Sequence, residues 1–140
     1  MTQQPTDTGT VYPLKIADAR HSVRHVFVRD LNVDVNIGIH AHERRGRQRV
    51  IVNVDLSVTE AERPVRDKIG DVLCYEEVAA GIERIVAEGH INLVETLAER
   101  IAGIVRNEFN VPGLRLRVSK PGAVTGSRDV GVVIERGEKL

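Results

Sequence analysis

Lys120 is the side chain in this sequence best placed for proton chemistry, because of its position in an alternating pattern. It continues the spacing of Leu114, Leu116 and Val118, which predicts a strand with one apolar face. A lysine directed toward apolar surroundings has its charged form disfavoured and can give or take a proton near neutral pH. The alternative is that Pro121 stops the strand and Lys120 turns into solvent.

Glu95 is a candidate for binding a flat heterocycle. It lies at the expected start of a helix, where a carboxylate can accept two parallel N–H bonds. The competing interpretation is a capping box, in which Asn92 caps the helix and Glu95 stands three residues further on.

Tyr75 and Glu43 are two further candidates. The Tyr75 phenol, at the start of the first expected helix, can relay a proton or simply pack with its hydroxyl satisfied. Glu43 follows the first long strand, where a loop glutamate is usually solvated.

Two other groups of side chains near Glu43 suggest ligand binding. His40 and His42 at alternate strand positions would place both rings on one face, but no third metal ligand is evident, so no metal site is predicted. An arginine cluster can bind phosphate or form a solvated loop; its members are Arg44, Arg45, Arg47 and Arg49.

The elements that position these residues follow from the spacing of apolar side chains. Alternation predicts strands around residues 26–39, 50–58, 114–120 and 130–134, with a bulge or bend at Arg29–Asp30. Helical spacing predicts a helix over 76–88, capped by Gly89, and a second from Leu93 to about residue 110. The order ββααββ indicates an α+β domain: an antiparallel sheet with both helices on one face and open edges that invite pairing with other subunits.

Bulk properties limit the class of protein. The 140 residues suit one domain, and 20 basic against 20 acidic residues argue against a nucleic-acid or membrane-surface protein. The single cysteine, Cys74, excludes a disulfide framework within one chain and fits a cytoplasmic protein. Residues 1–22 are expected to form a flexible polar tail, and 23–140 the folded domain.

Several short motifs, in this order, resemble the dihydroneopterin aldolases of folate biosynthesis. The resemblance runs from about His25 to Gly137. It is carried by Ile37-Gly38-Ile39 with Glu43 and Gln48, Asp71 with Tyr75, Leu93-Val94-Glu95 with Leu97-Ala98-Glu99, Ser119-Lys120-Pro121-Gly122-Ala123-Val124, and Val130-Gly131-Val132.

This resemblance implies a tunnelling fold, with a four-stranded antiparallel sheet and two helices after its second strand. It also implies a homo-oligomer in which four subunits join their sheet edges into a barrel-shaped ring and two rings stack into an octamer. The active sites would lie between subunits.

The implied reaction is a retro-aldol cleavage of 7,8-dihydroneopterin to glycolaldehyde and 6-hydroxymethyl-7,8-dihydropterin. The pterin ring supplies its own C=N bond as electron acceptor, so neither a Schiff base, a metal nor another cofactor is expected. By resemblance, Lys120 would be the general acid/base and Tyr75 would move protons. Glu95, with the Val94 backbone, would bind the amino-pyrimidine edge, and Glu43 the polyol.

Two rival functions share these residues. An epimerase acting on dihydroneopterin or its triphosphate would use the same bond cleavage and then re-form the bond with inverted configuration. A non-catalytic pterin-binding or assembly module would tolerate changes at Lys120 and Tyr75.

Overall fold

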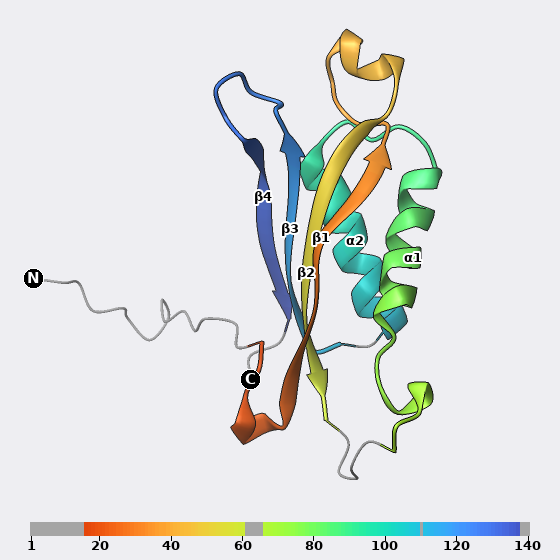
Figure 1. Cartoon of the computed structure of the whole chain (residues 1–140), viewed down its shortest axis with the longest axis vertical. Coiled ribbons are helices and arrows are strands. Elements are labelled where there is room, and N and C mark those ends of the chain that lie inside the picture. The colour runs from red at the N-terminus through yellow and green to blue at the C-terminus, as the bar shows by residue number, and fades with distance from the viewer. Residues whose placement is uncertain (1–15, 61–65, 110, 138–140) are drawn as a thin grey trace, which may run out of the picture.

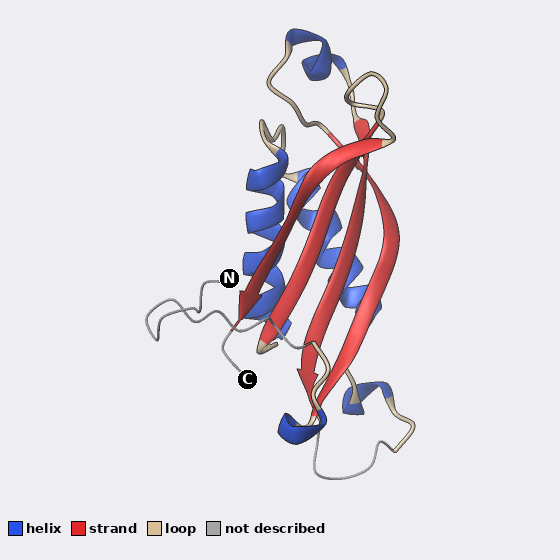
Figure 2. Ribbon diagram, turned by 90° about the vertical axis from the view of Figure 1, so that its left-hand side faces the viewer, coloured by secondary structure: helices blue, strands red, loops and turns tan. Residues whose placement is uncertain are grey.

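The computed structural model describes residues 16–60, 66–109 and 111–137. Four strands form one antiparallel sheet in the order β1-β2-β3-β4: β1 Val23–Val35, β2 Gln48–Thr59, β3 Gly113–Pro121 and β4 Asp129–Gly137. Helices α1 (Tyr75–Ala87) and α2 (Val94–Phe109) both cover the same face of this sheet, and among the described residues no helix covers the other face (Figures 1 and 2). The α+β fold and the ββααββ order predicted from the sequence are confirmed.

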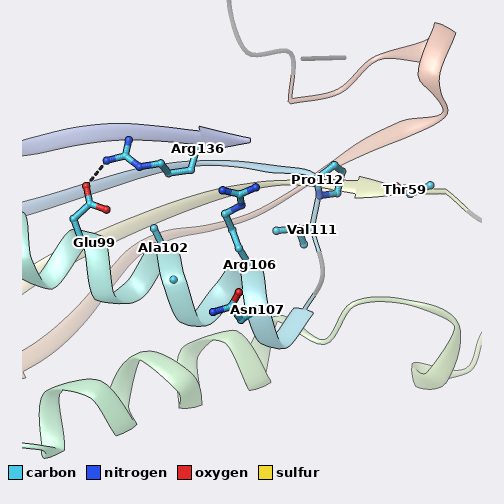
Figure 3. Close-up of a pocket in the computed structure, with 9 residues that line it drawn as sticks. Thr59, Glu99, Ala102, Arg106, Asn107, Val111, Pro112 and Arg136 are labelled. Carbon is cyan, nitrogen blue, oxygen red and sulfur yellow. Dashed lines mark hydrogen bonds and ion pairs between the residues drawn. The ribbon is translucent and has the colours of Figure 1, made fainter. Parts of the chain in front are cut away.

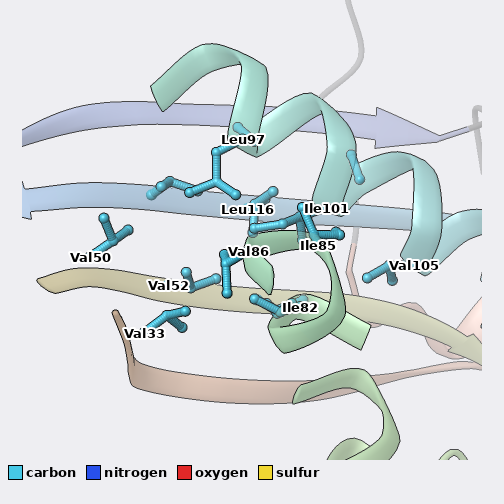
Figure 4. Close-up of a cluster of buried hydrophobic side chains, with 14 of the residues drawn as sticks. Val33, Val50, Val52, Ile82, Ile85, Val86, Leu97, Ile101, Val105 and Leu116 are labelled. Atoms are coloured by element: carbon cyan, nitrogen blue, oxygen red, sulfur yellow. The ribbon is translucent and has the colours of Figure 1, made fainter. Parts of the chain in front are cut away.

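The core lies between the sheet and the two helices. Alternate residues of the strands, such as Val52 and Leu116, are fully buried and meet the apolar stripes of the helices (Figure 4). Burial of each large aliphatic side chain contributes roughly 1.5–3 kcal/mol, so this layer stabilises the fold although its fully buried members are all aliphatic. The helix side chains that fill it are Val78, Ile82, Ile85, Val86, Leu97, Ile101 and Val105.

The bulge predicted at Arg29–Asp30 is present. The pairing of β1 with β2 shifts between Val28 and Leu31, and Asp30 has a positive φ of 51°. The extra residue restores the alternation, so that Val33 and Val35 face the helices. At the end of α1, Gly89 takes a positive φ of 140°, as its predicted capping position requires.

The first strand ends earlier than the alternation predicted. β1 stops at Val35, and Gly38 has a φ of 125°, which breaks the extended pattern. Ile37 is fully buried and forms an isolated bridge with Ile91, whereas Ile39 is 59% exposed. The connection to β2 is therefore a shaped loop that contains a short 3-10 helix, η3, at Ala41–Arg45.

Two further 3-10 turns complete the described chain: η2 at Ala19–His21 and η4 at Ile69–Asp71. Most of the predicted tail, residues 1–15, lies outside the described residues. In the remainder, Ile16 is buried and its carbonyl accepts a hydrogen bond from the Ser57 hydroxyl at 2.9 Å. Among the described residues, no helix is both long enough and apolar enough to span a membrane.

Candidate active site

Lys120 and Glu43 form a buried ion pair. The Lys120 Nζ lies 2.6 Å from the Glu43 Oε2, and the two side chains are only 13% and 8% exposed. Lys120 is still part of β3, paired with Val130, and Pro121 continues the strand opposite Asp129. The Lys120 side chain therefore points to the same face of the sheet as Val118. The alternative that Lys120 turns into solvent is wrong.

Three donors surround the Glu43 carboxylate. Besides Lys120, the Gln48 amide donates to Oε2 at 3.1 Å, and the backbone N–H of His40 donates to Oε1 at 3.3 Å. These contacts, with that of the Lys120 ammonium foremost, lower the pKa of Glu43 from 4.5 to about 2. The expectation of a solvated loop glutamate is thus wrong, because η3 turns the side chain inward.

Gly38 makes room for this carboxylate. A Cβ atom at this position would overlap the Glu43 carboxyl group, and its φ of 125° is rarely adopted by residues other than glycine. Gln48 holds the same loop from the other side, because its amide also donates to the Ile37 carbonyl at 2.6 Å. The local sequence therefore shapes a loop that buries one carboxylate.

Val94 and Glu95 begin α2, beside the Glu43 loop. The bridge between Ile37 and Ile91 places the α1–α2 connection next to the end of the extended segment. Val94 is half-buried and Glu95 is exposed, with its carboxylate in the first helical turn. A negative charge is favoured there by the helix dipole and the free N–H groups.

The capping box predicted for this helix is not formed as expected. Since α2 begins at Val94, Leu93 takes the position directly before the helix, and Asn92 lies one residue earlier. The Leu97 N–H accordingly donates to the Leu93 carbonyl at 3.2 Å. Asn92 instead accepts a hydrogen bond from Arg44 at 2.9 Å, which leaves Glu95 available for another partner.

Tyr75 lies far from these residues within one chain. It is the first residue of α1, is 60% exposed, and stands at the end of the helix remote from the Ile37–Ile91 bridge. Thirteen helical residues span about 20 Å at 1.5 Å per residue. Figure 1 shows α1 running from the η4 end of the molecule to the end that carries the β1–β2 connection. A single chain therefore brings together Lys120, Glu43 and the start of α2, but not Tyr75.

His40 and His42 do not occupy a strand, contrary to the prediction. They lie at the start of η3, where their rings stack with centroids 5.6 Å apart. In the part of the chain that the structure describes, no group of three or more His, Cys, Asp or Glu side chains is placed to hold a metal ion. The neighbouring arginines, from Arg44 to Arg49, are exposed.

Two hollows lie elsewhere on the surface. One, of about 680 Å³, lies between α2 and the end of β4, and its lining includes Arg106 and Arg136 (Figure 3). Another, of about 530 Å³, lies beside the start of α1 and is lined by Ile69, Val72 and Cys74. Lys120 lines neither of these hollows. The candidate site judged by its reactive side chains therefore differs from the sites judged by cavity volume. The buried ion pair marks the site better, because it concentrates groups suited to proton transfer.

Some contacts of the site were not predicted from the sequence. Gln48 was recognised only as part of a motif, and no role was expected for His90 or for the pairing of Arg44 with Asn92. The His90 and Arg44–Asn92 contacts join residues about 50 positions apart, so no local pattern reveals them, whereas Gln48 lies only five residues from Glu43.

Comparisons with known proteins agree with this geometry. The FolB dihydroneopterin aldolase family model matches residues 26–135. The dihydroneopterin aldolase of Escherichia coli K12 is 33% identical over 115 residues, which cover 82% of this chain and 94% of that protein.

Two solved structures share both the fold and a substantial part of the sequence. The E. coli dihydroneopterin aldolase in complex with neopterin has a TM-score of 0.77 and 32% identity, and the match covers 81% of this chain and 99% of that one. The Burkholderia thailandensis dihydroneopterin aldolase bound to guanine has a TM-score of 0.74 and 35% identity, with 86% and 97% covered. From its sequence, its fold and the motif residues gathered around Lys120, this chain belongs to the dihydroneopterin aldolase family.

Proposed function

We propose that this chain cleaves the side chain of 7,8-dihydroneopterin by a retro-aldol reaction. The products are glycolaldehyde and 6-hydroxymethyl-7,8-dihydropterin, an intermediate of tetrahydrofolate biosynthesis. The observation that carries the proposal is the buried Lys120–Glu43 pair beside the start of α2, in a chain that belongs to the dihydroneopterin aldolase family.

The reaction needs one proton to leave a hydroxyl group and one to arrive at carbon. When the hydroxyl on the second side-chain carbon loses its proton, the bond between the first and second carbons breaks, and glycolaldehyde forms. The electron pair moves into the conjugated C=N of the ring, whose nitrogen is protonated. A proton then adds to the first side-chain carbon and the ring nitrogen releases its own, so atoms and charge balance without a redox partner.

Lys120 is proposed as the general acid/base of this sequence. Its Nζ donates a hydrogen bond to the Glu43 carboxylate at 2.6 Å, which holds the side chain in place as a proton donor. Proton transfer by one positioned group typically contributes about a hundredfold to ten-thousandfold in rate. A water molecule between Lys120 and the ring nitrogen would carry the proton.

Glu43 is proposed to bind the polyol side chain. Its carboxylate is ionised well below neutral pH, because its pKa is lowered to about 2 by the Lys120 ammonium and the Gln48 amide. An ionised carboxylate accepts strong hydrogen bonds from hydroxyl groups. Glu43 therefore orients the polyol side chain of the substrate next to Lys120, which exchanges a proton with the pterin ring.

Glu95 and the Val94 backbone are proposed to bind the opposite edge of the pterin. The amino-pyrimidine edge presents two parallel N–H donors, which match the two oxygens of a carboxylate. Guanine has the same edge, and the B. thailandensis relative is described as bound to guanine. The exposed Glu95 in the first turn of α2 supports this role.

Tyr75 is proposed to enter the site from a neighbouring subunit, since it lies at the end of α1, a helix about 20 Å long, that is remote from the Glu43 loop of its own chain. Strands β1 and β4 form the two edges of the sheet, and among the described residues no further strand pairs with either edge. Exposed apolar side chains also lie at both ends of the molecule, with Ile39 and Leu93 near Glu43, and Ile69 and Val72 near Tyr75. We therefore propose a four-subunit ring, with two rings stacked into an octamer.

An epimerase is the nearest alternative activity. It would use the same cleavage, retain glycolaldehyde and re-form the bond on the opposite face. Nothing in the described site opposes this return step, so we propose epimerisation as a side activity of the aldolase. As part of the same proposal, the reaction takes place in the cytoplasm, in keeping with the free thiol of Cys74.

The test is an assay of purified protein with 7,8-dihydroneopterin, in the presence of a chelator, followed by separation of the products. We expect glycolaldehyde and 6-hydroxymethyl-7,8-dihydropterin in equal amounts. Accumulation of the epimer alone would make the epimerase the main activity, and absence of any product would disprove both. If Lys120 and Tyr75 can be replaced without loss of activity, the non-catalytic module is favoured instead.

A further inference from the structure

We infer that Arg44, Asn92 and His90 are positioning residues that fix the distance between Glu95 and the Glu43–Lys120 pair. This inference rests on the proposed function, in which the two ends of one rigid substrate meet these two groups. We call the contact region between residues 36–44 and 90–92 the junction.

A hydrogen bond between the side chains of Arg44 and Asn92 links the segment that carries Glu43 to the segment that carries Glu95. Arg44 directly follows Glu43, and Asn92 stands three residues before Glu95. The Arg44 Nη2 donates to the Asn92 Oδ1 at 2.9 Å, across 48 positions of sequence. This contact is exposed to solvent, but its donor is a charged guanidinium, which makes it stronger than a bond between neutral groups, and it links the η3 turn to the start of α2.

Three further hydrogen bonds reinforce the same region. The Gly38 N–H donates to the Ile91 carbonyl at 3.0 Å, and the Ile91 N–H donates to the Asn36 carbonyl at 2.8 Å. His90 Nε2 lies 2.7 Å from the Gly38 carbonyl oxygen, so this nitrogen carries the hydrogen.

The junction therefore couples the recognition end of the site to its reactive end. Glu95 would hold one edge of the pterin, and Lys120 must meet the ring nitrogen beyond it. Displacements of about 1 Å in such an arrangement can cost on the order of a hundredfold in rate. A substitution that loosens the junction leaves Glu95 and the Glu43–Lys120 pair intact but changes the distance between them.

The expected signature is a loss of turnover with little loss of recognition. For Arg44→Gln and Asn92→Ala we expect kcat to fall about 10- to 100-fold, while KM changes less than about threefold. Because the two side chains act through one contact, the double variant should be no worse than either single variant. Arg44→Lys keeps a charged donor and should recover part of the activity.

A binding comparison separates a positioning role from a merely structural one. Guanine probes only the Glu95 end, whereas neopterin spans both ends. Arg44→Gln should therefore leave guanine binding unchanged and weaken neopterin binding by no more than the roughly threefold change expected for KM. Arg100→Gln is the matched control, because Arg100 is an exposed arginine on the helix that carries Glu95, and it should change neither.

The outcomes distinguish this inference from the proposed function. A wild-type protein that binds neopterin but does not cleave 7,8-dihydroneopterin, and whose neopterin affinity is selectively weakened in Arg44→Gln, would support the junction and disprove the aldolase. Equal loss of guanine and neopterin binding, additive effects of the two single variants, or unchanged kcat in both would overturn the inference. Thermal unfolding of each variant shows whether the fold is retained.

Discussion

Glu43 Oε2 and Lys120 Nζ lie 2.6 Å apart, although 77 positions separate the two residues in the sequence. The pair joins the β1–β2 connection to the end of β3, so it belongs to both the fold and the proposed reaction. Its two roles can be separated, because they respond differently to substitution and to pH.

Replacing Lys120 should abolish turnover more than it weakens binding. Lys120→Met removes the proton donor, and we expect kcat to fall about a hundredfold to ten-thousandfold. It also leaves the Glu43 carboxylate without its cation, which destabilises the fold because the pair is largely shielded from solvent. Denaturant unfolding of Lys120→Met beside Lys120→Met/Glu43→Gln tests this, since the double variant should recover much of that stability.

Lowering the pH should remove a stabilising contribution from Glu43. Its pKa is lowered from 4.5 to about 2 in the folded chain, chiefly by the hydrogen bond from Lys120. The contribution is therefore complete above pH 4.5 and is lost as the pH falls through about 2. Chemical denaturation between pH 6 and pH 3 should show a shallower loss of stability for Glu43→Gln than for the wild type, and identical slopes would contradict this pKa.

Glu95→Ala should mainly weaken binding. If its carboxylate accepts two charge-assisted hydrogen bonds from the pterin edge, their loss raises the Kd for guanine or neopterin about 100-fold or more. The measurement is calorimetric titration of each ligand into the variant. Glu99→Ala is a suitable control, because Glu99 is exposed on the same helix and pairs with Arg136 instead.

Mixing two inactive variants should restore activity if subunits share sites. A site in a mixed ring is intact when one subunit supplies Lys120 and its neighbour supplies Tyr75. Random assembly of equal amounts of Lys120→Ala and Tyr75→Phe therefore gives intact sites about a quarter of the time. Subunits are mixed by unfolding and refolding together before the assay. No recovery in refolded mixed rings would show that Tyr75 acts within its own chain or not at all.

Gly38→Ala should destabilise the chain and reduce activity. The added methyl group would overlap the Glu43 carboxyl group, in a backbone conformation with a φ of 125°. Overpacking and backbone strain of this kind cost about 1–3 kcal/mol each. Gly103→Ala is the contrasting control, because a Cβ atom added at Gly103 would meet no other group within 4 Å and the position is helical. That substitution should stabilise the chain by about 0.5–1 kcal/mol.

Periodicity predicted the parts of the fold that depend on regular burial. The alternation through Val52, Val54 and Leu56 predicted β2, and the change of parity at Arg29–Asp30 predicted the bulge in β1. Both follow from the rule that successive strand residues face opposite sides. The same rule placed Lys120 on the buried face, which the structure confirms.

The loop after β1 could not be predicted in this way. Alternation appeared to continue through Ile37 and Ile39, but the positive φ of Gly38 ends it. Glu43 looked like a solvated loop residue because its partners, Gln48 and Lys120, approach only after the chain has folded. Residue spacing describes neighbours along an element, whereas these contacts depend on tertiary structure.

The position of Tyr75 at the far end of α1 has a consequence for inheritance. If every site takes Lys120 from one chain and Tyr75 from the next, natural selection acts on the contact surfaces as strongly as on the chemistry. A substitution at Ile69 or Leu93 would then be inherited as an enzyme deficiency, although it changes no reactive group. After gene duplication, one copy could lose Lys120 and the other Tyr75, and each would survive only while both were expressed.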